Sequence, residues 1–455
     1  MTHTEALWHQ AGMPPAALGH LTLTGEGNGL PSSFAVGPAA QASIAAMALA
    51  AAEIHHARGA PRQAVSVDLL HACAEFRSER LLQVDGRPAP ELWDAIAGLY
   101  PTAEGWVRLH TNFPHHRDGV LALLGVENDR DAVAAALLGR QALEFEQAAA
   151  EAGLCVAAMR SFAEWDGTPQ ARAVADHPLR ITRIGDAPAE PMPPSARPLE
   201  GLRVLELTRI IAGPVAGRAL AAQGADVLLI TAPHLPAVAP LVIDTGRGKR
   251  AAELDLRVPE GEAALRALAA GADVVLQSYR PGALAAHGLA PESLAAARPG
   301  IVCASLSAYG TAGPWGGRRG FDSLVQTASG FNVAEAAAAG QGTPRPLPAQ
   351  ALDHASGYLL AFGILVALHR RMRDGGSWSV EVSLAATARW LRGMGRVRDG
   401  FNCHDPSRED LEPFLEEGDS GFGRLSATRP GGVLGATPAF YARPSVPLGT
   451  HAPSW

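Results

Sequence analysis

The chain has 455 residues, of which 47% are hydrophobic and 18% are charged, with 49 glycines and 35 prolines. A chain of this length usually folds as two domains or as a large domain with a smaller one, and this composition excludes a largely disordered protein. The formal net charge of -7, without any Lys/Arg run, excludes nucleic acid as the main partner.

The four cysteines are far apart and show neither a CxxC pair nor metal-ligand spacing. We therefore expect reduced thiols and no metal site. The N-terminal stretch MTHTEALWHQAG lacks the basic start and apolar core of a signal peptide, and the apolar runs are interrupted before they could span a bilayer. The sequence predicts a soluble, cytoplasmic protein that does not act with a membrane.

The first predicted elements lie in Leu30–Phe76, where a small-residue turn leads to an apolar helix, a polar loop, an alternating strand and another helix. The same order, also beginning with Leu-Pro, returns in Leu347–Trp390. We interpret residues 1–80 as a degenerate copy of the region around this second segment.

Residues 81–185 are predicted to form a small domain. Within it, residues 91–116 are typical of a helix followed by a short hairpin, and further helices are expected to about residue 175. His115 and His116 have no carboxylate or cysteine at metal-ligand spacing, so we place them in a solvated loop. Residues 186–197, DAPAEPMPPSAR, suit an extended linker.

After the linker, short strands and helices alternate. LRVLEL and DVLLI are typical of buried strands around the helix AGPVAGRALAAQGA, and GEAALRALAAGADVVLQSY and PGIVCASLS repeat the pattern. Such alternation predicts a Rossmann-like parallel sheet covered by helices for residues 198–400. The spacing in AGPVAG does not fit GxGxxG, so no dinucleotide site is inferred. Residues 401–455 are acidic and then Pro/Gly-rich, and we expect an extended tail with little regular structure.

Asp353 begins an otherwise apolar helix, where only small and hydrophobic residues follow His354. A carboxylate at this place could be a cap, a charge held by the helix dipole, or a nucleophile. The first copy has Val36 or Pro38 there, depending on the alignment, and neither is acidic. Because losing a cap costs about 1 kcal/mol, this difference favours a role that only the second segment performs.

The chain resembles the class III CoA-transferases, the group that contains formyl-CoA and carnitine-CoA transferases. The resemblance is carried by PLEGLRVLELTRIIAGPVAGRALAAQGADVLLI, GRGKRAAELDLRVPEG, ADVVLQSYRPGAL and SAYGTAGPWGGRRGFDSLVQTASG, and covers about residues 198–390, the family's first half. Residues from about 24 to 180, with LYPTAEGWVRLH, resemble its second half, so the order of the halves is reversed. The resemblance implies a Rossmann-like large domain with a smaller α+β domain. Ordinary members interlock as ring-shaped dimers, which makes a homodimer a candidate assembly.

The resemblance also implies a function. Asp353 falls where the family carries its nucleophilic aspartate, which moves coenzyme A (CoA) from an acyl-CoA to a small carboxylic acid through an aspartyl-CoA thioester. No metal and no permanently bound cofactor is implied, because the CoA thioester is the substrate. The candidate CoA-binding residues in the matching segments are Lys249, Arg250, Arg257, Arg280, Tyr309 and Gly310. Relatives often have Ile-Glu and a basic residue after the second strand, whereas this chain has Ile-Thr-Ala-Pro at residues 230–233, so one expected anchor of the nucleotide is missing.

Two alternatives stay open. An acyl-CoA racemase of the same superfamily uses a His and an Asp as two bases, typically in a Gly-His-Asp segment. Here Phe321 replaces that histidine and carries no proton, which favours transfer; His354 could in principle substitute. The other alternative is a non-catalytic CoA-binding scaffold, because the halves are rearranged and the first copy lacks the nucleophile. The residues do not indicate which acids are exchanged.

Overall fold

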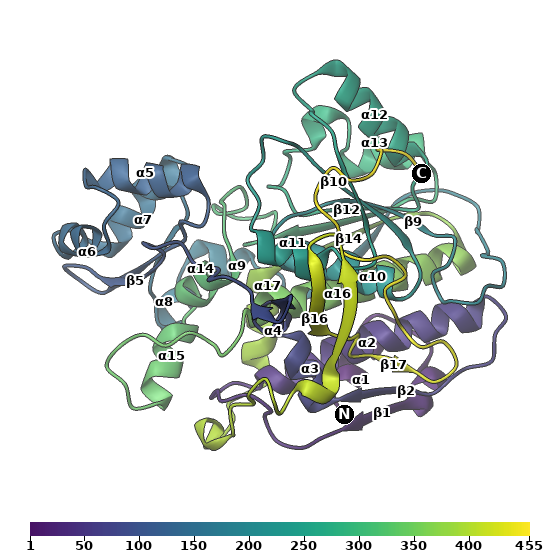
Figure 1. Ribbon diagram of the computed structural model, residues 1–455, viewed down its shortest axis with the longest axis horizontal. Helices are drawn as coiled ribbons and strands as arrows, with labels where there is room; N and C mark the ends of the chain where they lie inside the picture. The colour runs from purple at the N-terminus through teal and green to yellow at the C-terminus, as the bar shows by residue number, and fades with distance from the viewer.

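A seven-stranded sheet forms the centre of the large domain in the computed structural model, which describes residues 1–455 (Figure 1). Its strands, in spatial order, are β11 (Arg250–Glu253), β10 (Asp226–Thr231), β9 (Arg203–Leu207), β12 (Val274–Gln277), β13 (Val302–Ser307), β14 (Ser377–Ser383) and β8 (Leu179–Gly185). All neighbours are parallel except β8, which pairs antiparallel with β14. The predicted parallel sheet is thus confirmed. The chain order of its strands reverses between β9 and β12, and ligands bind at such switch points in open α/β sheets.

Helices cover both faces of this sheet, which explains its continuously apolar strands. They are α10 (Ala212–Ala222), α16 (Ala351–Asp374), α17 (Leu384–Gly393), α12 (Pro259–Ala270) and α13 (Pro291–Ala297). Three further helices pack on these: α11 (Ala239–Thr245) lies against α10, α14 (Asp322–Ala328) lies against α16 and α17, and α15 (Phe331–Ala338) lies against α14. Helix α16 is apolar around its whole circumference because it lies inside the protein, packed against α10 and against α2 (Val36–Ala57). It is the one helix long and apolar enough to cross a membrane, and its apolar window is fully buried.

A glycine allows α16 to approach α10 closely. A Cβ atom at Gly357 would lie 2.6 Å from the carbonyl oxygen of Ala212 and 2.8 Å from Cβ of Val215, so a larger residue would push the helices apart. This contact is one turn beyond Asp353 and brings the first turn of α16 beside the start of α10.

The N-terminal segment repeats the local architecture around α16. In it α2 leads to β2 (Val65–Asp68) and α3 (Leu69–Glu75), as α16 leads to β14 and α17. Strand β2 is parallel to β1 (Leu21–Thr24) and antiparallel to β17 (Val433–Leu434), just as β14 is parallel to β13 and antiparallel to β8. The third residue of α2 is Pro38, and the third residue of α16 is Asp353. Pro38 rather than Val36 is therefore the structural counterpart of Asp353.

The small α+β body lies to one side of the large domain (Figure 1). It consists of the antiparallel strands β5 (Gly98–Pro101), β6 (Trp106–Leu109) and β7 (Val156–Ala158) with α5 (Pro114–Leu124), α6 (Arg130–Leu138) and α7 (Ala142–Glu151), around a core of its own. The hairpin and the later helices are confirmed, whereas the helix expected at the start of residues 91–116 is absent. The body is narrower than the predicted 81–185, because β8 belongs to the large sheet.

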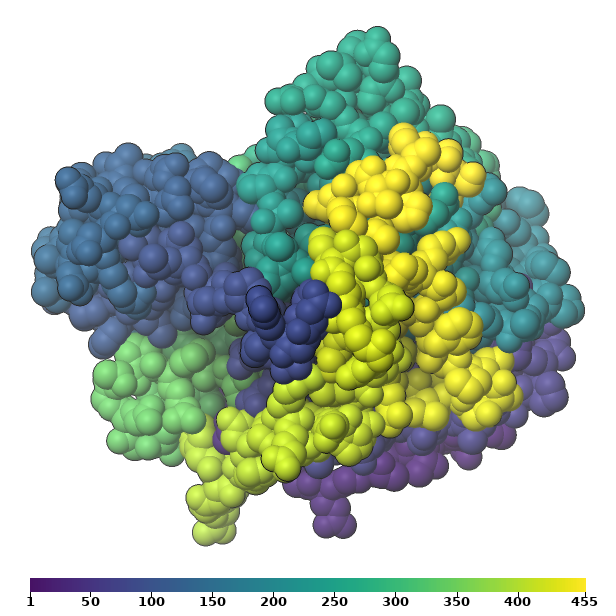
Figure 2. Space-filling model, viewed as in Figure 1, coloured from purple at the N-terminus to yellow at the C-terminus, as the bar shows by residue number.

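The C-terminal residues are more regular than expected. Strands β15 (Leu415–Ser420) and β16 (Gly423–Thr428) form a hairpin that continues through β3 (Gln83–Val84) to β4 (Arg87–Pro88). Alternating residues Leu425 and Ala427 of β16 are buried, and that burial stabilises the hairpin. The prediction of a tail with little regular structure is therefore wrong for residues 415–434, although the segments around the hairpin run over the surface of the large domain (Figure 2).

The remaining elements are short. They are α1 (His3–Gln10), η1 (Pro15–His20), α4 (Ser78–Leu81), α8 (Phe162–Asp166), α9 (Pro169–Ala173), η2 (Ala285–His287), η3 (Gly400–Asn402) and η4 (Glu412–Phe414). Residues 186–197 contain no helix or strand and connect β8 to β9, in keeping with the predicted linker.

A buried ion network joins the N-terminal segment to the large domain. The Arg218 guanidinium, on α10, lies 2.8 Å from Oε2 of Glu75 and 2.7 Å from Oδ1 of Asp244. All three side chains are 1% exposed, so each charge depends on the others for solvation. Arg247 also pairs with Asp244 at 2.7 Å, and the Ser78 hydroxyl donates to the same carboxylate at 2.6 Å.

Candidate functional site

Asp353 lines two neighbouring cavities, of about 450 Å³ and about 470 Å³. Ile210, Ile211 and Phe321 also line both, so the two cavities meet around the Asp353 carboxyl group. Asp353 is the only carboxylate that lines both cavities. We therefore take Asp353 as the centre of the candidate site.

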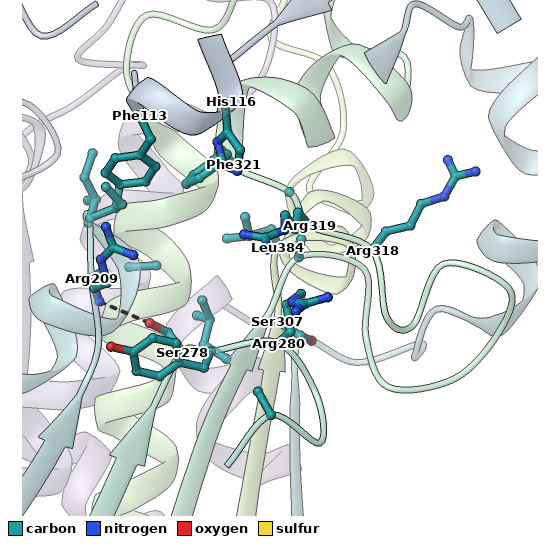
Figure 3. A pocket seen from close by; sticks show the side chains of 18 of the residues that line it. Phe113, His116, Arg209, Ser278, Arg280, Ser307, Arg318, Arg319, Phe321 and Leu384 are labelled. Atoms are coloured by element: carbon teal, nitrogen blue, oxygen red, sulfur yellow. Dashed lines mark hydrogen bonds between the residues drawn. The ribbon is translucent and has the colours of Figure 1, made fainter. Parts of the chain in front are cut away.

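The first cavity lies at the switch point of the sheet, and we call it the arginine-lined cavity (Figure 3). Arg209 follows β9, Arg280 follows β12, and Ser307 ends β13, so the carboxyl ends of three neighbouring strands contribute to it. The loop before α14 adds Arg318 and Arg319. Asp353 is the only carboxylate that lines this cavity together with the four arginines. A cavity of this charge suits a polyanion.

Two of the four arginines are free to bind a ligand. The side chains of Arg280 and Arg319 line the cavity and make no ion pair or hydrogen bond with another residue of the protein. By contrast, Arg209 donates to the carbonyl of Pro236 and its guanidinium lies 4.5 Å from the centre of the Phe113 ring, and Arg318 donates to Gln147 at 2.7 Å. Arg280 and Arg319 are therefore the strongest candidates for contacts with phosphate groups.

The second cavity has the opposite charge, and we call it the carboxylate-lined cavity. Four carboxylates and one arginine line it: Glu79, Glu91, Asp322, Asp353 and Arg80. Its apolar wall consists of Ala89, Pro90, Leu92, Trp93, Ile210, Ile211, Leu241 and Phe321. Residues before 113 and residues after 209 both contribute, so both halves of the chain are needed to form it.

Asp322 caps the helix that carries Asp353. Its Oδ2 accepts hydrogen bonds from the backbone N–H groups of Leu352 at 2.7 Å and of Asp353 at 3.0 Å, and its Oδ1 accepts one from Gln326. The N-cap position of α16 belongs to Gln350, whose side chain makes no capping bond. Asp353 lies in the first turn, so the interpretation of Asp353 as the helix cap is wrong. The cap comes from a residue 31 positions earlier.

The two aspartates hold their protons unusually tightly. Burial raises the pKa of Asp353 well above its ordinary value, and the neighbouring carboxylates of Asp322 and Glu79 raise it further. Burial also raises the pKa of Asp322, to about 6, although the N–H groups that it accepts act in the opposite direction. A desolvated carboxylate of raised pKa is a stronger nucleophile once ionised, which fits a catalytic role for Asp353.

His354 pairs with Glu79, a carboxylate of the carboxylate-lined cavity. Its Nε2 lies 3.0 Å from Oε2 of Glu79, and its ring stacks on Phe76 at 5.4 Å between ring centres. His354 lines neither cavity, so its position does not support the idea that it replaces the histidine of a racemase. Phe321, which occupies that histidine's place, stacks on His110 at 3.8 Å. Burial lowers the pKa of His110 well below its ordinary value, so this imidazole is neutral.

Three of the predicted basic residues lie outside both cavities. The Lys249 ammonium is 1% exposed and lies 2.8 Å from Oε1 of Glu206, so it serves a buried ion pair and lines neither cavity. Arg250 pairs with Asp226 at 2.8 Å, and the exposed Arg257 pairs with Asp255 at 2.7 Å. Basic residue type alone did not distinguish these roles from phosphate binding.

The other predicted residues lie in or beside the arginine-lined cavity. Asp353 and Arg280 line it. Tyr309 lies behind it, buried against Trp315 at 5.0 Å between ring centres, and the N–H of Gly310 donates to the hydroxyl of Ser307 at 3.2 Å. Tyr309 and Gly310 thus shape the loop around the cavity without lining it.

The sequence interpretation missed several lining residues. Arg209 lies two residues after the end of a predicted strand, so its place at the sheet's carboxyl edge was a usable signal. His116 was placed in a solvated loop, but it lies in the first turn of α5 and lines the arginine-lined cavity. Burial, with His115, Arg319 and Arg209 nearby, lowers the pKa of His116 to about 3. No group of three metal-ligating side chains occurs in the chain.

Residues 199–409 match the family described as CoA-transferase family III. The chain is 37% identical over 202 residues to the probable fatty acyl-CoA transferase Rv3272 of Mycobacterium tuberculosis, covering 42% of this chain and 51% of that protein. It is 31% identical over 382 residues to an acyl-CoA transferase of Gibberella moniliformis, covering 73% of this chain and 66% of that protein. It is 34% identical over 211 residues to a succinate–glutarate CoA-transferase of Agrobacterium fabrum, covering 42% and 52%.

A crystal structure of Rv3272 aligns with a TM-score of 0.39 at 34% identity, over 44% of this chain and 58% of that one. The chain therefore spans about half to two thirds of the length of these relatives.

Proposed function

We propose that this chain, which belongs to CoA-transferase family III, moves CoA from an acyl-CoA donor to a carboxylic acid acceptor through a covalent intermediate on Asp353. The observation that carries the proposal is the place of Asp353, a buried carboxylate where the arginine-lined and carboxylate-lined cavities meet. One cavity suits the phosphates of CoA and the other an acyl group.

The chemistry requires one protein carboxylate. An oxygen of Asp353 attacks the thioester carbonyl, and the C–S bond breaks. CoA departs as a thiolate, and a mixed anhydride between the acyl group and Asp353 remains. The thiolate then attacks the carbonyl carbon of Asp353, which releases the donor acid as a carboxylate and leaves an aspartyl-CoA thioester. The acceptor carboxylate reverses these two steps, forming a second anhydride and then the new acyl-CoA. No proton is transferred, and CoA is itself the substrate, so the reaction needs neither a separate base nor a resident cofactor.

The start of α10 is suited to the oxyanions that form in these steps. Ile211 lines both cavities and Ala212 lines the arginine-lined one, and no side chain caps this helix. The first N–H groups of a helix have no intrahelical partner, so they are available to a developing negative charge. Ile210, immediately before, has a φ of 74°, which is rare for a β-branched residue and costs about 1–3 kcal/mol. We propose that this strained turn aims the N–H groups at the reacting carbonyl.

Arg280 and Arg319 are proposed to contact the phosphates of CoA. We expect Arg280→Ala and Arg319→Ala each to raise the KM for acyl-CoA by about 10- to 150-fold with a smaller change in kcat, because each removes a charge-assisted contact of about 1.5–3 kcal/mol. The measurement is steady-state CoA transfer at several acyl-CoA concentrations. Arg266→Ala is the matched control, since Arg266 is exposed on α12 and pairs with Glu262. An unchanged KM in both cavity variants, with a raised KM in Arg250→Ala or Arg257→Ala, would place CoA along β11 instead.

Asp322 is expected to influence the pH dependence of transfer. In Asp322→Asn an oxygen remains for the two backbone N–H groups of α16, but a negative charge beside Asp353 is lost. Because a like charge raises the pKa of a carboxyl group, its removal lowers the pKa of Asp353. We expect the acidic limb of the pH profile of kcat/KM to move to lower pH, by about one unit. An unmoved limb with uniformly reduced activity would show that Asp322 acts only as a cap.

Transfer itself is tested by incubating the protein with an acyl-CoA and a second carboxylic acid in deuterium oxide. The proposal predicts a new acyl-CoA whose acyl α-carbon carries no deuterium. Deuterium at the α-carbon without CoA transfer would instead indicate a racemase. Binding of CoA without either reaction would indicate a scaffold.

A further inference from the structure

The charge contrast between the two cavities bears on which acids this chain exchanges. In the proposed reaction CoA occupies the arginine-lined cavity, so the acyl group extends into the carboxylate-lined cavity on the other side of Asp353. Beyond Asp353, that cavity holds the carboxylates of Glu79, Asp322 and Glu91 against the single guanidinium of Arg80.

The one arginine is already engaged. Its Nε lies 3.4 Å from Oε1 of Glu79, and its Nη1 donates to the carbonyl of Pro348 at 2.9 Å. Glu79, whose Oε2 also lies 3.0 Å from Nε2 of His354, and Asp322 are both buried, so water does little to screen their charges. A second anion in the cavity would have to compete with Glu79 for Arg80.

Asn112 and His110 are neutral polar residues of the cavity wall, and both are held by other residues of the protein. The Asn112 amide donates to the carbonyl of Leu92 at 2.9 Å and accepts from the N–H of Asp94 at 3.0 Å. Nδ1 of His110 lies 3.5 Å from the hydroxyl of Ser323, and its buried Nε2 has no partner. This imidazole nitrogen, the indole N–H of Trp93 and the amide of Gln350 also line the cavity and can satisfy polar groups of a ligand, but none of them carries a charge that would neutralise a carboxylate.

Glu91 extends the negative charge toward solvent. Its Oε1 accepts the N–H groups of Leu92 at 3.0 Å and Trp93 at 3.2 Å, which fixes the carboxylate against the cavity wall. Because this side chain is exposed, its field is weakened by water, and it contributes less than the two buried carboxylates.

We infer that the carboxylate-lined cavity selects acyl groups that carry no second negative charge, and that it rejects the acyl groups of dicarboxylic acids. This inference rests on the proposed function. It separates this chain from relatives such as the succinate–glutarate CoA-transferase of Agrobacterium fabrum, whose name specifies two dicarboxylic acids. A distal carboxylate would lose its hydration in the cavity and gain only the shared Arg80, whereas an amide or an alkyl end of the same size meets no such penalty.

The test compares acids that differ in charge and hardly at all in size. Identity exchange is measured as the entry of isotope from free glutarate into glutaryl-CoA, and from free glutaramate, its half-amide, into glutaramoyl-CoA. Exchange within one acid needs no knowledge of a second substrate. We expect kcat/KM for the half-amide to exceed that for the dicarboxylate by about 10-fold or more, since unfavourable electrostatic interactions of 1.4 kcal/mol already correspond to a factor of ten.

A charge-reversal variant tests whether the negative charge of the cavity causes the preference for glutaramate. Glu91→Lys places a cation beside the cavity, and we expect it to raise glutarate exchange relative to glutaramate exchange several-fold. Glu127→Lys, an exposed position outside both cavities, is the matched control and should leave the ratio unchanged.

The outcomes separate this inference from the proposed function. If the kcat/KM for glutarate exchange equals or exceeds that for glutaramate exchange, the inference is overturned, while CoA transfer is established. A preference for glutaramate that Glu91→Lys does not reduce would also contradict the electrostatic cause. If neither these acids nor monocarboxylic acids without a second charged group, such as butanoate and benzoate, exchange, the proposed function itself fails.

Discussion

Asp353→Asn is expected to reduce kcat/KM for CoA transfer by at least about 10³-fold, because the amide cannot form the mixed anhydride. Asparagine has nearly the same size as aspartate, so the packing around the first turn of α16 should be kept. The measurement is CoA transfer by the purified variant, with retained binding of acyl-CoA as the control for an intact cavity. Transfer within 10-fold of the wild type would exclude Asp353 as the nucleophile.

The same variant should be at least as stable as the wild type at neutral pH. The pKa of Asp353 is raised in the folded protein above that of the unfolded chain, so the folded protein binds this proton more tightly. The contribution of Asp353 to the stability of the fold therefore falls as the pH rises from about 4, the pKa of an aspartate in the unfolded chain, to the raised pKa of Asp353 in the folded protein. The Asp353→Asn variant has no ionisable group at this position, so it does not lose stability in this way. Urea unfolding at several pH values should show the variant gaining relative to the wild type as pH rises, and a relative loss would contradict the burial argument.

The second large effect concerns stability. Arg218→Met is expected to lower the free energy of unfolding by about 3–5 kcal/mol, because Glu75 loses its guanidinium partner and Asp244 keeps only Arg247. The methionine fills similar space, so the loss reflects stranded charge more than a cavity. Urea unfolding measures it, and Arg266→Met, whose ion pair with Glu262 is exposed, should change stability by less than about 0.5 kcal/mol.

This prediction also tests how the N-terminal segment is held. Glu75 lies on α3, in the N-terminal segment, while Arg218 and Asp244 belong to the large domain. A loss below about 1 kcal/mol for Arg218→Met would mean that the apolar packing of α2 on α16 holds the two parts together without this network.

The large sheet could be predicted because its signal is local. Buried parallel strands such as β9 and β10 are short apolar runs between helices, and each run carries its own pattern. Asp353 could be singled out as a candidate for a similar reason, since a lone carboxylate at the start of an apolar helix stands out and Pro38, the third residue of α2, is not acidic.

The site around Asp353 could not be predicted in the same way, because it depends on tertiary contacts. Nothing in the sequence near Asp322 indicates that it caps a helix beginning almost thirty residues later. Lys249 was expected to meet phosphate, but β9 and the turn before β11 place it against Glu206 inside the large domain. The hairpin of β15 and β16 was missed because charged residues on its exposed face obscure the alternation that buries Leu425 and Ala427.

The most direct test of the account is mass spectrometry of the protein after incubation with an acyl-CoA and rapid quenching. We predict a CoA adduct confined to the peptide that contains Asp353. That adduct should be released by hydroxylamine and be absent from Asp353→Asn. CoA transfer without an adduct on that peptide, or with an adduct on another residue, would contradict the assignment of Asp353 as the nucleophile.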